Sequence, residues 1–169
     1  MGGVSTVADC GGVTVIHAAG ATSVSSLSLA VAEVASRGDQ YLEVELSNWE
    51  CPSGGLPRLR LRNPACLRPT LETRAVAGET ALVIDWTTSG PIVGFVDMWA
   101  VLVGDSTRPG RTSEPPQSTD DCAKLLAATS TPVVLRPTMD TALRDIATIG
   151  WAMQECGFNT LLLGATQKP

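Results

Sequence analysis

Few side chains of this chain are suited to acid–base, nucleophilic or metal chemistry. Its 169 residues hold one histidine, His17, and five cysteines that stand far apart with no C-x-x-C pair. Zinc sites are built from closely spaced thiolate and imidazole ligands, which this spacing does not provide. Glycine-rich phosphate-binding motifs and H-E-x-x-H are also missing from the sequence. We therefore expect no metal, no cofactor and no catalytic residue, and the protein is predicted not to be an enzyme.

Two groups of residues keep a hydrolase as the minority interpretation. Gly104-Asp105-Ser106 follows an apolar run and is similar to one block of the GDS-type esterases, which would make Ser106 a nucleophile and require His17 as its base. Asp85 and Asp97 flank a predicted turn, and a close buried carboxylate pair would raise one pKa. An ordinary turn at 104–110 and solvent-facing aspartates explain the same residues, and we favour these structural explanations.

Five arginines lie within 17 residues that contain Glu72 as their one acid: Arg58, Arg60, Arg62, Arg68 and Arg74. The chain as a whole carries a net charge of −5, whereas this segment is positively charged. Such a segment could bind the phosphates of a nucleic-acid backbone. It lacks interleaved aromatic residues for base stacking. The arginines are therefore candidate RNA contacts, with a structural alternative.

The alternative is a hairpin in which arginines meet glutamates. Residues 58–62 alternate arginine with leucine, and residues 41–46 alternate glutamate with leucine or valine. This period of two predicts two strands, each with one apolar and one solvent-facing side. If the strands pair around residues 49–56, the charges lie opposite each other and largely cancel. This arrangement is favoured over nucleic-acid binding.

A second, longer hairpin is predicted over residues 80–103. Residues 80–86 and 92–103 read as strands around a turn at 87–91. Both faces of the second strand are apolar, so it should be central in a sheet or covered by a neighbouring subunit. Trp86, Phe95 and Trp99 are the candidate subunit-interface residues.

Hydrophobic spacing, glycines and prolines predict the remaining elements. They are a strand over 12–17, a helix over 25–35 ending at Gly38, a proline-rich connection over 63–70, a strand over 71–76, a linker over 105–118, a helix over 122–128, a strand over 133–135, a helix over 139–156 and a strand over 158–163. Residues 25–35 also fit the alternation of a strand, and the helix is favoured. In the helix over 139–156, the spacing predicts a buried stripe of Leu143, Ile146, Gly150 and Met153.

Composition favours one globular domain without a membrane span. The chain is 44% hydrophobic and 17% charged, so it should either pack tightly or bury apolar surface against other copies of itself. No stretch is long and apolar enough to cross a bilayer. The N-terminus lacks the pattern of a secretory signal, and the odd, scattered cysteines fit unpaired buried thiols in a reducing compartment.

The strand-rich part resembles the jelly-roll coat proteins of small non-enveloped RNA viruses. The resemblance rests on residues 80–86 and 90–99 and covers about residues 12–104. It implies a mainly β, α+β fold: an antiparallel β-sandwich of jelly-roll type over 1–104, a linker over 105–118 and a helix-containing segment over 119–169. It further implies self-assembly into a shell and a place in the virion. These families commonly carry a basic N-terminal arm, which this chain lacks. RNA contact would therefore resemble that of coat proteins that manage without such an arm, or would fall to the arginines.

Two other functions stay open. A small cytoplasmic α/β enzyme or ligand-binding module would have its site near the 104–118 loop, and the alternation of helix and strand over 119–164 favours a parallel β-α-β unit there. An adaptor or immunity-type binding protein fits the composition equally well.

Overall fold

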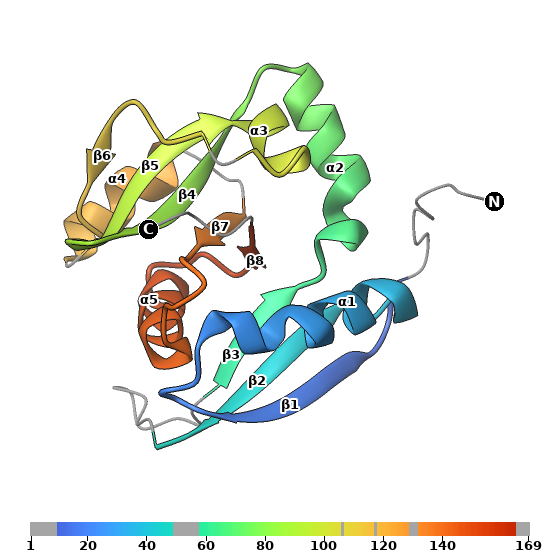
Figure 1. Ribbon diagram of the computed structural model, residues 1–169. Helices are drawn as coiled ribbons and strands as arrows, with labels where there is room; N and C mark the ends of the chain where they lie inside the picture. Colours follow the sequence, from blue (N-terminus) through green and yellow to red (C-terminus); the bar gives the residue numbers. More distant parts are fainter. Residues whose placement is uncertain (1–9, 49–57, 106, 117, 129–131, 165–169) are drawn as a thin grey trace.

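The chain folds around two β-sheets (Figure 1). Side chains of both sheets are buried in a common hydrophobic core. The computed structural model describes residues 10–48, 58–105, 107–116, 118–128 and 132–164. Apolar residues of both sheets and of the helix over residues 143–155 meet in this core.

The first sheet has the strand order β1-β2-β3. Strand β1 (Val13–Ala19) runs parallel to β2 (Tyr41–Ser47), and β2 runs antiparallel to β3 (Arg58–Arg62). A short 3-10 helix, η1 (Val24–Leu27), and helix α1 (Ser28–Arg37) connect β1 to β2. The helix predicted over 25–35 is thus confirmed, and α1 ends at Gly38, whose φ of 74° is the left-handed conformation that glycine adopts easily.

The second sheet has the order β6-β5-β4-β7-β8. Its parallel half joins β4, β7 and β8, and its antiparallel half joins β4, β5 and β6. The bounds are β4 (Thr80–Thr87), β5 (Gly90–Asp97), β6 (Thr112–Ser113), β7 (Val133–Arg136) and β8 (Leu161–Leu163). The predicted β-α-β unit is confirmed, because helix α5 (Leu143–Glu155) connects the parallel strands β7 and β8.

Opposite faces of the second sheet are covered by different elements. Leu82 and Ile84 of β4 face α5 and the first sheet in the larger core cluster. Ala81 and Val83 face helices α2 (Pro64–Val76) and α3 (Met98–Leu102) in a smaller cluster. Helix α4 (Thr119–Ala128) precedes β7. Because both of its faces are covered, β4 reads as a continuous apolar run.

The N-terminus of α5 ties the two sheets together. Its amides at Leu143 and Arg144 donate to the carbonyls of Thr22 (2.8 Å) and Gly20 (2.9 Å) in the connection after β1. The first amides of a helix have no partner within the helix, so a loop from the first sheet supplies the acceptors. The predicted buried stripe of this helix, Leu143, Ile146, Gly150 and Met153, is confirmed.

One predicted strand is wrong, and a second is right only in its first half, because the remaining residues are helical. The predicted strand over 71–76 and the connection before it form α2, where Asn63 caps the helix and Pro64 occupies its first turn. Proline is favoured at that position, since the first amides lack helical partners in any case. The predicted strand over 92–103 ends at Asp97, and the chain turns into α3. Met98, Val101 and Leu102 pack in the smaller core cluster, so these apolar residues form a buried helix face and not a strand.

The α+β class is confirmed, with three-stranded and five-stranded sheets that remain separate and open. The pairs β1–β2, β4–β7 and β7–β8 are parallel, unlike the all-antiparallel pairing expected of a jelly roll. Part of the predicted linker is structured, because β6 pairs with β5 at the edge of the second sheet. Strands β7 and β8 of the C-terminal segment complete the same sheet.

Two disulfide bonds overturn the expectation of unpaired cysteines. Cys10 bonds to Cys66 on α2, and Cys122 on α4 bonds to Cys156 at the end of α5. The partners are 56 and 34 residues apart, so their pairing depends on how the helices pack and left no local signal in the sequence. Cys51 lies outside the described residues.

Candidate functional site

The solvent-facing side of the first sheet carries the predicted pairs of arginine and glutamate. Glu43 lies opposite Arg60, and Glu45 lies opposite Arg58, as the predicted hairpin requires. Arg60 Nε is 3.1 Å from Glu43, and Arg58 reaches Glu45 at 3.1 Å and Glu43 at 3.5 Å. The predicted hairpin and its charge pairing are therefore confirmed.

The other candidate RNA contacts also have partners. Arg60 and Arg62 lie over the Tyr41 ring, with guanidinium carbons 3.8 and 5.2 Å from its centroid. On α2, Arg68 pairs with Glu72 at 2.9 Å, and Arg74 pairs with Glu79 at 3.5 Å. The five arginines thus divide between β3 and α2, and RNA contact through them stays a prediction.

The three candidate interface residues differ in exposure. Trp86 is buried in the larger core cluster, and Phe95 packs against the same cluster from a partly buried position. Trp99 on α3 is 46% exposed. Only Trp99 among these three therefore presents a large apolar surface to solvent.

The candidate catalytic groups are not brought together. His17 lies on the solvent-facing side of β1, where its Nδ1 is 3.2 Å from Glu45. Ser106 lies outside the described residues. Asp85 pairs with Ile92 and Asp97 with Thr80 across the hairpin, so the two aspartates do not face each other.

Asp85 instead forms a buried ion pair that the sequence did not reveal. Its oxygens lie 2.6 and 2.8 Å from Nε and Nη2 of Arg136, and both side chains are almost completely buried. Arg136 also donates to the carbonyls of Asp105 and Thr107. Arg136 therefore ties Asp85 of β4 to the backbone at Asp105 and at Thr107, and the favoured solvent-facing placement of Asp85 is wrong. The signal available in the sequence was Arg136, a single charged residue directly after the apolar residues 133–135.

The edge of the first sheet is the most unusual surface of the described residues. Strand β1 is seven residues long and, within the part of the chain that the structure describes, bonds to a neighbouring strand on one side only. Val13 and Val15 point to solvent and are 43% and 46% exposed. Natural edge strands are usually short, charged, bulged or interrupted by proline, because an open edge can pair with another chain. Apart from His17, β1 carries none of these protections.

No protein-family model, curated protein or solved structure matches this chain. Among the residues that the structure describes, no helix is both long and apolar enough to span a bilayer. The same residues contain no cluster of three or more His, Cys, Asp or Glu side chains fit to hold a metal ion.

Proposed function

We propose that the protein is a self-assembling structural subunit whose copies join through the open edge of β1. The observation that carries this proposal is the seven-residue strand with one bonded side and two solvent-facing valines. A second copy of β1, paired antiparallel about a two-fold axis, would satisfy the free backbone groups of both strands. Val13 and Val15 of each copy would then be covered by the neighbouring subunit.

A coat-protein function is the finer form of this proposal. A two-fold contact closes a dimer, so a shell needs a second contact on another surface. Trp99, 46% exposed, and Val103, 72% exposed, supply an apolar surface at α3 for that contact. The two disulfides favour virions or another oxidising location over a reducing cytosol.

RNA contact through the arginines is the least supported part of the coat-protein proposal. Arg58 and Arg60 already balance Glu43 and Glu45. Releasing those pairs would offset part of the attraction to phosphate. We therefore expect any RNA carried by the particles to bind weakly through this face, with strong dependence on salt.

Light scattering during size-exclusion chromatography tests the edge contact. Val15→Lys places a charge on the edge, and the new ammonium would lie opposite Glu43 in the register, so the fold should tolerate it. We expect the wild-type chain to run as a dimer or larger particle and Val15→Lys to run at the mass of one chain.

Leu29→Lys is the matched control, because Leu29 is 81% exposed on α1 and away from the edge. It should retain the wild-type mass. A wild-type protein that stays monomeric at high concentration contradicts the proposal. The proposal is also contradicted if Val15→Lys and Leu29→Lys lower the measured particle mass equally. Negative-stain images of closed particles would support the shell, and images of dimers alone would reject it.

A further inference from the structure

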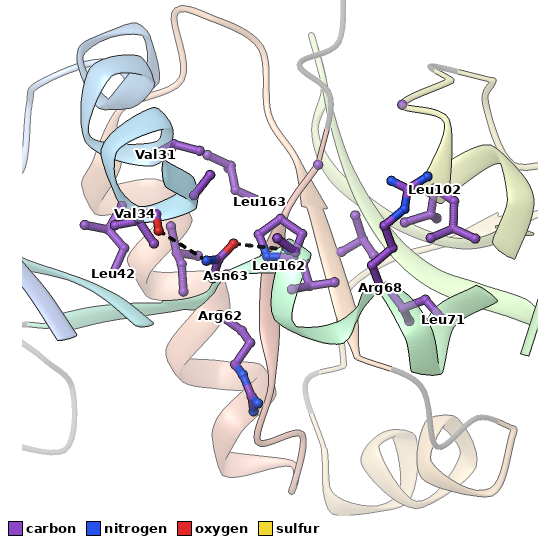
Figure 2. A pocket seen from close by; sticks show the side chains of 18 of the residues that line it. Val31, Val34, Leu42, Arg62, Asn63, Arg68, Leu71, Leu102, Leu162 and Leu163 are labelled. Atoms are coloured by element: carbon purple, nitrogen blue, oxygen red, sulfur yellow. Dashed lines mark hydrogen bonds between the residues drawn. The ribbon is translucent and has the colours of Figure 1, made fainter. Parts of the chain in front are cut away.

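A cavity of about 480 Å³ lies between the two sheets, and no residue of β1 lines it (Figure 2). Its wall comes from α1, β2, β3, α2, α3, β7 and β8, and its apolar lining includes Val31, Leu61, Leu71, Leu102 and Leu163. Small-molecule sites typically have volumes of roughly 300–1,000 Å³ and mostly apolar walls with a few polar groups. The cavity has the size and the lining of such a site.

Asn63 is the buried polar side chain of the wall, and its hydrogen bonds are made within the protein. Its Nδ2 donates to the carbonyls of Val34 (3.3 Å) and Asp39 (2.8 Å), and its Oδ1 accepts from the amide of Ala65 (3.1 Å). Asn63 therefore holds α1 and the start of α2 in place (Figure 2). Recognition of a polar ligand group is left to other residues.

Arg68 supplies a positive charge to the cavity wall. Its Nε donates to Glu72, and its two terminal nitrogens have no partner within the described ranges of the chain. Arg62 also contributes to the wall, but its side chain points away from the labelled leucines (Figure 2). Its guanidinium lies over the ring of Tyr41. No aspartate or glutamate of the described residues lines the cavity, so its electrostatics favour an anion.

We propose that this cavity binds a single-chain amphiphile with a carboxylate head group, the chemistry of a fatty acid. The acyl chain would lie among the leucine and valine side chains, where burial of its methylene groups is favourable. The carboxylate would bind the free terminal nitrogens of Arg68, because a planar guanidinium matches two carboxylate oxygens. Two arginines, Arg62 and Arg68, line the wall, and Glu72 balances one of these charges. One positive charge is left for one ligand carboxylate, whereas a doubly charged phosphate would keep an unmatched charge. This inference does not depend on self-assembly.

Isothermal titration calorimetry with dodecanoate tests the site. Ala35 is exposed and lines the cavity, and Ala32 is an exposed alanine of the same helix that does not. Ala35→Trp should fill the mouth and weaken dodecanoate binding at least tenfold, while Ala32→Trp should stay within about twofold of wild type. Absence of dodecanoate binding to the wild-type chain, or equal losses in both variants, would overturn the proposal.

The head group is tested by comparing dodecanoate with dodecanol. The wild-type protein should prefer dodecanoate, and Arg68→Gln should reduce that preference about tenfold with little change for dodecanol. Arg37→Gln is the control, since Arg37 also pairs with a glutamate one helical turn away but lies outside the cavity. An unchanged preference in Arg68→Gln, or an equal reduction in Arg37→Gln, contradicts the assignment of Arg68.

Discussion

The two sheets end in very different edges. The second sheet stops at β6, with two residues, and at β8, with three. The first sheet stops at β1, with seven residues and two solvent-facing valines. Short edge strands offer little backbone for another chain to pair with, whereas a long apolar edge invites pairing. This contrast is the basis of the proposal that copies join through the first sheet and not through the second.

The faces of the sheets differ as well. In β2, buried and partly exposed residues alternate, and the partly exposed positions include glutamates that pair with arginines. In β4, six consecutive residues are buried, including the charged Asp85. A charge therefore costs little on the first sheet and requires a buried partner on the second.

The largest effect is expected at the charge buried in the second sheet. Asp85→Ala leaves the Arg136 guanidinium without its carboxylate and should lower the free energy of unfolding by about 3–5 kcal/mol. Urea denaturation monitored by tryptophan fluorescence measures the change. If Asp85→Ala is as stable as wild type, the ion pair does not hold the second sheet together.

Removal of a disulfide should have the next largest effect. The double variant Cys122→Ser with Cys156→Ser unties α4 from α5 and should lose about 2–4 kcal/mol, mainly because the unfolded chain gains freedom. The same urea titration measures this loss. Free-thiol titration of the unfolded wild-type protein is the control. Four reactive thiols at the bonded positions would show that neither disulfide forms.

Asn63→Ala should lower the free energy of unfolding by a smaller amount. It removes the cap of α2 and the donor to the carbonyl of Asp39, while the carbonyl of Val34 keeps the amides of Gly38 and Asp39. We therefore expect a loss of about 1–3 kcal/mol in the free energy of unfolding. Asn63→Asp separates the two roles, because a carboxylate can still accept from Ala65 but cannot donate to the carbonyls. Equal stability of Asn63→Asp and wild type would contradict the role of the amide nitrogen.

The smallest effect is expected on the solvent-facing side of the first sheet. Glu45→Gln weakens contacts to His17 and Arg58, which are exposed, and should change stability by less than about 1 kcal/mol. Addition of salt to the wild-type protein should have a similarly small effect on the urea midpoint. A loss as large as that of Asp85→Ala would erase the distinction between the two sheets.

Local patterns predicted the elements whose partners are close in sequence. The alternation in residues 41–46 and 58–62 was sufficient for the hairpin and for its pairs of arginine and glutamate. The apolar spacing of α5 predicted its buried stripe. In these cases the spacing of the apolar residues fits either a strand or a helix and not both, so the local sequence predicted the element that forms.

The wrong predictions arose where the local sequence fits more than one structure or where the partners are distant in sequence. Pro64 and Pro69 made α2 look like a connection, although a proline at the helix start is compatible with the helix. Residues 98–102 are apolar on all sides, so their spacing could not separate a strand from a helix. The disulfides, the Asp85–Arg136 pair and the cavity join distant segments, and only the packed fold brings their members together.

Hydrogen–deuterium exchange of the associated protein tests the central claim most directly, because it reports which backbone amides become bonded between copies. We predict that peptides covering β1 gain protection as protein concentration rises, that those covering β6 do not, and that Val15→Lys removes the gain. Association that leaves the exchange of β1 unchanged would contradict the account, because the copies would then be joined somewhere else.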